Sequence, residues 1–138
     1  MKNKRILTVA DKVFGEYIEA AIKGYSSNLE HAGIAHCVDE AIDSILNNNI
    51  DGVYLNSLMI PRGNSTRYDI DMLMYSDFEP REGGLFVLEF ARNKGLVSVL
   101  GTMAENPEEI SKAEELGAKV FEATRYKDIV DYFSRKLK

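Results

Sequence analysis

The chain has 138 residues, of which 45% are hydrophobic and 28% charged, and this fits one domain with its own hydrophobic core. A net charge of −5 argues against a broad nucleic-acid-binding surface, and no apolar run reaches the roughly 20 residues that would cross a bilayer. Because Cys37 is the only cysteine, an intramolecular disulfide is excluded and a reducing, cytoplasmic location is expected. We therefore expect a single cytoplasmic domain over residues 1–138 that binds neither nucleic acid nor membrane.

Strand-like and helix-like segments then alternate along the chain. Residues 5–10 predict a first strand, and apolar residues spaced three and four apart from Phe14 to Leu29 predict a helix. Gly33 is expected to end this helix. His31 would then lie in the last turn, where a cation interacts favourably with the helix dipole.

The rest of the chain continues the alternation. Asp39 is expected to cap one helix, and Asn106 followed by Pro107 and Glu109 predicts the start of another that Gly117 ends. The remaining predicted strands cover residues 34–38, 53–55, 97–100 and 118–122, and further predicted helices cover residues 84–93 and 127–137. Five such strand–helix units predict an α/β fold, doubly wound, with a five-stranded parallel sheet between two layers of helices.

Polar residues stand where several of these strands end. Asp11 follows the first strand, Asn56 the third, Thr102 the fourth and Thr124 the fifth. In open parallel sheets, ligands bind beyond the carboxyl ends of the strands. These four residues are therefore the candidate site.

The order and spacing of these residues resemble those of response-regulator receiver domains over nearly the whole chain. The resemblance implies a flavodoxin-like sheet with strand order 2-1-3-4-5. It also implies that Asn56 stands at the phosphoacceptor position and Asp11 at the second of two acids that hold Mg²⁺. Thr102 matches the switch Ser/Thr, and Phe121 falls where receivers place the switch aromatic.

Three departures from the receiver pattern remove chemistry. Ala10 replaces the first acid, Asn56 the phosphoacceptor aspartate, and Thr124 the lysine that follows the fifth strand. An amide is a far poorer nucleophile than a carboxylate, and Mg²⁺ prefers negatively charged oxygen ligands. We therefore expect no phosphorylation and no catalysis; Asp11 is the one remaining candidate ligand for Mg²⁺, and no other cofactor is predicted.

A long segment, residues 62–82, replaces a connection that is only a few residues long in receivers. Between positions 70 and 78 it carries six large apolar residues: Ile70, Met72, Leu73, Met74, Tyr75 and Phe78. The insertion could be a lid, an interface or a self-packing surface loop. Arg62 and Arg67 could contact a phosphate or a carboxylate, or remain solvated.

Two functions fit the sequence. The favoured one is a non-catalytic receiver-like signalling module that binds a protein partner or forms a homodimer. Resemblance places that contact on the last two helices and the fifth strand; the insertion is the other candidate surface. The alternative is a small-ligand sensor or minor enzyme, in which residues 62–82 close over Asp11, Asn56 and Thr102 to hold a phosphate, a nucleotide or a cation.

Overall fold

The computed structural model describes residues 3–58, 60, 83–102 and 106–138. In chain order, its elements are β1 (Lys4–Val9), α1 (Lys12–Tyr25), β2 (Leu29–Ala35), α2 (Val38–Asn47), β3 (Gly52–Leu55), α4 (Gly83–Asn93), β4 (Val97–Thr102), α5 (Pro107–Glu115), β5 (Lys119–Glu122) and α6 (Tyr126–Lys136). Within the described part of the chain, none of the helices has both the length and the apolar character needed to span a bilayer.

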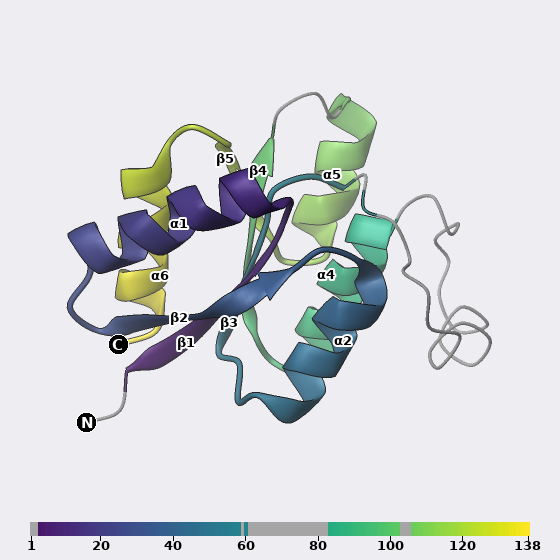
Figure 1. The fold of residues 1–138 in the computed structure, drawn as a ribbon. Coiled ribbons are helices and arrows are strands. Elements are labelled where there is room, and N and C mark those ends of the chain that lie inside the picture. Colours follow the sequence, from purple (N-terminus) through teal and green to yellow (C-terminus); the bar gives the residue numbers. More distant parts are fainter. Residues whose placement is uncertain (1–2, 59, 61–82, 103–105) are drawn as a thin grey trace.

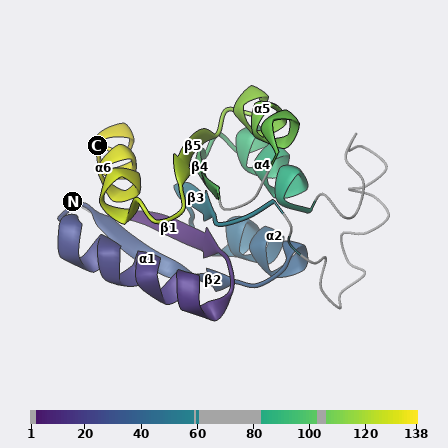
Figure 2. The same ribbon diagram turned by 90° about the horizontal axis from the view of Figure 1, so that it is seen from above.

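The five strands form one parallel sheet in the order β2-β1-β3-β4-β5, which confirms the predicted topology. Helices α1 and α6 cover one face, whereas α2, α4 and α5 cover the other (Figures 1 and 2). The start of β1 and the end of α6 lie side by side at one edge of the molecule in both views. The sheet therefore lies between two layers of helices, as alternating strands and helices predict.

Each face of the sheet has its own apolar core. Ile18 and Ile22 of α1 meet Phe133 of α6 and Tyr54 of β3 on one face. The other core brings together buried residues of α2, α4 and α5, among them Ile42, Leu88 and Ala113. β1, β3 and β4 are flanked by strands on both sides and carry side chains into the cores. Because these strands are buried on both faces, their sequences are nearly continuous apolar runs.

The boundary between α1 and β2 differs from the prediction. Helix α1 ends at Tyr25 and β2 begins at Leu29, so Leu29 and His31 lie in a strand and not in the helix. Ser26 stops the helix, because its hydroxyl oxygen accepts hydrogen bonds from the backbone N–H groups of Asn28 and Leu29. Leu29 is buried in the α1–α6 core and happens to continue the helical spacing of apolar residues, which explains the error.

Gly33 also has another role than the predicted one. It lies inside β2, where the register with β1 shifts between Ile6 and Leu7, and its φ of +138° lies in a region that side chains other than glycine rarely adopt. The glycine therefore accommodates an irregularity in an edge strand and does not end a helix.

Asp39 is not the cap of α2. The capping position is Cys37, and Asp39 is buried within the first turn. Cys37 is buried, and burial raises the pKa of its thiol. A raised pKa disfavours the thiolate, so the side chain has the character of a small hydrophobe.

The described residues on either side of the insertion are in contact with each other. The backbone N–H of Gly84 donates to the Leu58 carbonyl oxygen at 3.0 Å. A Cβ atom on Gly84 would lie 2.4 Å from the Leu58 Cα, and one on Gly83 would lie 2.6 Å from the Ile60 carbonyl oxygen. Glycine is required at both positions because α4 begins directly against the chain that leaves β3.

Candidate functional site

Register places the candidate residues at one edge of the sheet. Leu55 pairs with Val9 on one side and with Leu100 on the other, and the Asn56 N–H donates to the Val9 carbonyl oxygen at 3.0 Å. Asp11 lies two residues beyond the end of β1, and Thr102 is the last residue of β4. All these ends point the same way, so Asp11, Asn56 and Thr102 share the carboxyl edge of neighbouring strands.

Asn56 is the buried polar residue of this edge, with 5% of its surface exposed. The hydroxyl of Tyr54, two residues earlier on the same face of β3, donates to the Asn56 Oδ1 at 3.0 Å. Tyr54 is fully buried, so this contact is shielded from solvent and holds the amide in one orientation.

Gly101 provides the space that the Tyr54 hydroxyl occupies. A Cβ atom at Gly101 would lie 2.1 Å from the Tyr54 hydroxyl oxygen, which is far inside van der Waals contact. Tyr54, Asn56 and Gly101 therefore form one unit, in which a glycine on β4 admits the phenol that positions the amide on β3. The sequence analysis did not find this unit, although the spacing of Tyr54 and Asn56 places both side chains on one face of a strand.

Asp11 performs a structural task. Its carboxylate is exposed and caps α1, with Oδ1 accepting a hydrogen bond from the Phe14 N–H at 2.9 Å. A negative charge at this position interacts favourably with the helix dipole. The neighbouring Ala10 is buried, and its carbonyl oxygen lies 3.1 Å from the Nδ1 atom of His36.

Thr102, Phe121 and Thr124 lie at the β4–β5 side of the edge. The Thr102 hydroxyl donates to the Phe121 carbonyl oxygen at 3.3 Å, so it joins the two strands. The half-buried Phe121 ring packs edge-on against Tyr132 of α6 at a centroid distance of 5.9 Å. Thr124 is exposed in the turn after β5.

This donor set does not fit Mg²⁺. Asp11 contributes the only carboxylate among the candidate residues and already caps a helix. The Asn56 oxygen is neutral and accepts a hydrogen bond from the Tyr54 hydroxyl. Within the described residues, no group of three or more His, Cys, Asp or Glu side chains could hold a metal ion. Mg²⁺ requires several hard oxygen ligands with negative charge in near-octahedral geometry.

Residues 62–82 lie outside the described residues. The predicted anion contacts of Arg62 and Arg67 therefore stay predictions, as does the role of the insertion as lid or interface. The alternative function, a ligand sensor closed by this segment, depends on the same residues.

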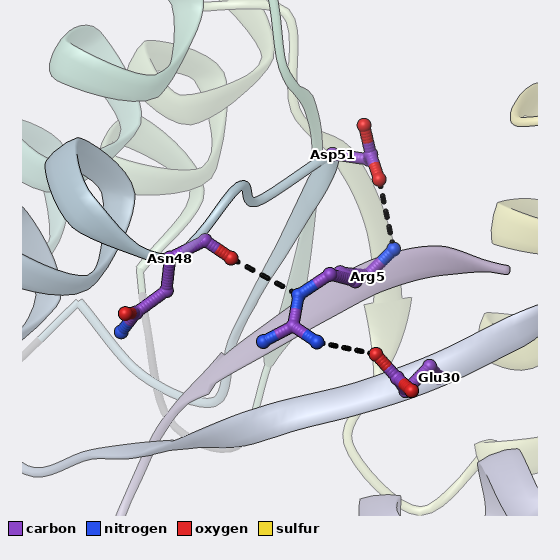
Figure 3. Close-up of polar contacts among 4 residues, drawn as sticks. All are labelled: Arg5, Glu30, Asn48 and Asp51. Carbon is purple, nitrogen blue, oxygen red and sulfur yellow. Dashed lines mark hydrogen bonds and ion pairs between the residues drawn. The ribbon is translucent and has the colours of Figure 1, made fainter. Parts of the chain in front are cut away.

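The opposite edge of the sheet carries a polar cluster that the sequence analysis missed (Figure 3). The Arg5 guanidinium forms an ion pair with Glu30 of β2, and its Nε donates to the Asn48 carbonyl oxygen at 3.0 Å. The Arg5 N–H donates to the Asp51 carboxylate at 2.9 Å. Arg5 thus ties the starts of β1, β2 and β3 together, and we assign this cluster to stability because its charged groups satisfy one another.

Comparison with known proteins identifies the fold. No protein-family model and no curated protein sequence matches the chain. Among solved structures, the chain is similar to the RcsB response regulator of Salmonella typhimurium, with a TM-score of 0.72, 11% identity, and 99% of this chain and 60% of that chain covered. It is also similar to a CheY-like receiver domain protein from Methanospirillum hungatei (TM-score 0.71, 18% identity, 99% and 94% covered). A Francisella response-regulator receiver domain gives a TM-score of 0.65 at 17% identity, with 99% and 100% covered.

The chain therefore has the fold of response-regulator receiver domains, as the sequence predicted. Identities of 11–18% show the fold and leave the chemistry to be argued from the residues of this chain. The chain spans only 60% of the length of the RcsB protein.

Proposed function

We propose that this chain is a non-catalytic, receiver-like regulatory module of the cytoplasm that acts by binding a protein partner and is not phosphorylated at position 56. The observation that carries the proposal is the buried amide of Asn56, which accepts a hydrogen bond from the Tyr54 hydroxyl. The resemblance matches this position to the phosphoacceptor carboxylate of receivers. A neutral amide cannot attack phosphorus as a carboxylate does.

The surroundings of Asn56 support the same reading. Transfer of a phosphoryl group depends on positive charge that neutralises the oxygens of the group in the transition state. Ala10 and Thr124 cannot supply a metal ligand and a cation, and the Asp11 carboxylate caps α1. None of the described candidate residues therefore supplies the nucleophile, a second carboxylate for the metal or the cation, so restoring one of them is not sufficient.

Exposure to acetyl phosphate and Mg²⁺, followed by intact-mass measurement of the protein, tests the proposal. We expect the wild-type protein to gain no phosphoryl group, while a receiver domain that retains the aspartate is labelled in the same reaction. Asn56→Asp should be labelled in less than about one tenth of the molecules, because the metal ligands and the cation are still lacking. Efficient phosphoryl labelling of the wild-type protein would overturn the proposed function.

A further inference from the structure

Helix α1 carries most of the exposed large apolar side chains found in the described residues. Four such residues are exposed: Val13 (54%), Tyr17 (53%), Tyr25 (55%) and Leu46 (44%). The first three belong to α1, and none of the four lies on α5, β5 or α6. The exposed residues of β5 are the charged Lys119 and Glu122. Among the described residues, the surface that the resemblance implied for dimer formation therefore carries none of these exposed large apolar side chains.

The exposed residues of α1 form a continuous stripe. Val13, Tyr17, Ala20 and Gly24 follow one another at spacings of four, three and four, so they lie on one face of the helix, and all four are exposed. The Tyr17 ring contacts the rings of Phe14 and Tyr126, with centroid distances of 6.3 and 5.9 Å. These contacts orient the tyrosine, which lowers the entropy that it would lose on binding.

Two opposite charges lie along one side of this stripe. Glu16 and Lys23 are exposed and seven residues apart, which is two helical turns. Their ion pairs within the helix, to Lys12 and Glu19, are 4.0 Å long and solvent-exposed, so they hold these side chains only weakly.

The stripe is complementary to itself in size and charge. When two copies of α1 lie antiparallel about a two-fold axis, the same flank of each helix faces the other. Placing Glu16 opposite Lys23 of the partner subunit forms two ion pairs by symmetry. The same placement sets Tyr17 over Ala20 and Gly24 of the partner subunit, the smallest side chains of the stripe. The large Tyr17 ring thus packs into the space above two small residues, and each charged residue lies opposite one of the other sign.

We propose that this chain forms a homodimer through antiparallel packing of α1 against α1 of the partner subunit. The inference rests on the proposed function, because it names a second copy as a partner of a module that acts by association. A helix of 14 residues is about 21 Å long, which is small for a stable interface. The dimer is therefore weak, with a dissociation constant in the micromolar range or above.

Sedimentation velocity of the full chain over a concentration series measures this equilibrium directly. The wild-type protein should shift from monomer to dimer between about 10 μM and 1 mM. Tyr17→Glu should raise the dissociation constant at least about tenfold, because it puts a charge where the aromatic ring packs. Leu46→Glu is the matched control: it changes an exposed apolar residue on α2, and it should leave the dissociation constant unchanged.

Charge exchange tests the antiparallel register. Glu16→Lys and Lys23→Glu should each raise the dissociation constant roughly tenfold, because each variant sets like charges opposite one another. Mixing the two single variants should restore association, since every lysine then faces a glutamate. An interface that placed Glu16 opposite Glu16 and Lys23 opposite Lys23 of the partner subunit would not be weakened by either single variant.

Gly24→Ala separates the interface from the fold. No atom lies within 4 Å of the position that a Cβ atom would take at Gly24, so alanine should not lower the melting temperature of the monomer. It should still raise the dissociation constant roughly fivefold, because the methyl group narrows the gap for Tyr17 of the partner subunit.

The proposal is overturned if the wild-type protein stays monomeric at 1 mM, or if it forms a dimer that Tyr17→Glu does not weaken. Failure of the mixed variants to associate also overturns it. These outcomes leave the phosphoryl-labelling test untouched, and efficient labelling would in turn leave the dimer standing. The two failures are therefore distinguishable.

Discussion

At the residue scale, the unit of Tyr54, Asn56 and Gly101 explains why the amide at the end of β3 is ordered. The Tyr54 hydroxyl donates to Asn56 from a fully buried position and occupies the space left by a residue without a Cβ atom. Each of the three residues therefore constrains the other two. Their coupling can be measured.

We predict that Gly101→Ala lowers the free energy of unfolding by about 2–3 kcal/mol, because its methyl group would lie 2.1 Å from the Tyr54 hydroxyl oxygen. Tyr54→Phe alone should cost about 1–2 kcal/mol through the lost hydrogen bond to Asn56. In the double variant the oxygen is gone, so the total cost should fall short of the sum by about 1 kcal/mol. Urea unfolding of the four proteins measures this difference.

Additive costs in that cycle would show that alanine at position 101 does not act through the tyrosine hydroxyl. The sequence alone could not predict this unit. Alternation along β3 puts Tyr54 and Asn56 on one face, but the closeness of Gly101 depends on the register of β3 against β4. Register between strands that are distant in sequence is a tertiary property.

At the element scale, the contact between α1 and β2 depends on a histidine that the sequence analysis placed in the helix. His31 lies in β2 with 3% of its side chain exposed. Its Nε2 lies 2.9 Å from the Thr8 hydroxyl of β1, and its Nδ1 lies 3.5 Å from the Glu19 carboxylate of α1. Burial lowers the pKa of His31 below its ordinary value of 6.5, and this outweighs the opposing effect of Glu19. Lys23 lowers the pKa further.

We predict that His31 makes the protein less stable in mild acid. A lowered pKa means that the unfolded chain binds a proton more readily than the folded one does. The contribution of His31 to stability is therefore complete above pH 6.5 and is lost as the pH falls below that value through the pKa of the folded protein. Urea unfolding at a series of pH values measures the slope.

His31→Gln should flatten the pH dependence below pH 6.5. An equal slope in the wild-type protein and in His31→Gln would contradict the prediction. The predicted helix extended past the observed end of α1 and so included His31, and this difference has a physical cause. Ser26 ends α1 through local hydrogen bonds, while Leu29 continues the apolar spacing of the helix into the strand.

At the scale of the whole molecule, the fold was predictable because the apolar pattern alternates between strands and helices five times. The helix that begins after Asn106 shows how directly such signals transfer: the Asn106 side chain caps α5 by accepting the Glu109 N–H at 2.9 Å. For the carboxyl edge of the sheet, the sequence predicted which residue types are present but not the contacts that they make. The task of Asp11 as a helix cap and the tie from Thr102 to β5 required coordinates.

The central claim is that the receiver fold is kept here while the metal-assisted phosphoryl chemistry is lost. Titration of the isotope-labelled protein with Mg²⁺ up to about 20 mM, followed by backbone amide NMR, tests this claim at the site itself. We predict small shifts at Asp11, Asn56 and Thr102 that grow linearly with Mg²⁺ concentration and do not saturate. Saturating shifts centred on these three residues, with a dissociation constant in the low millimolar range or below, would contradict the claim.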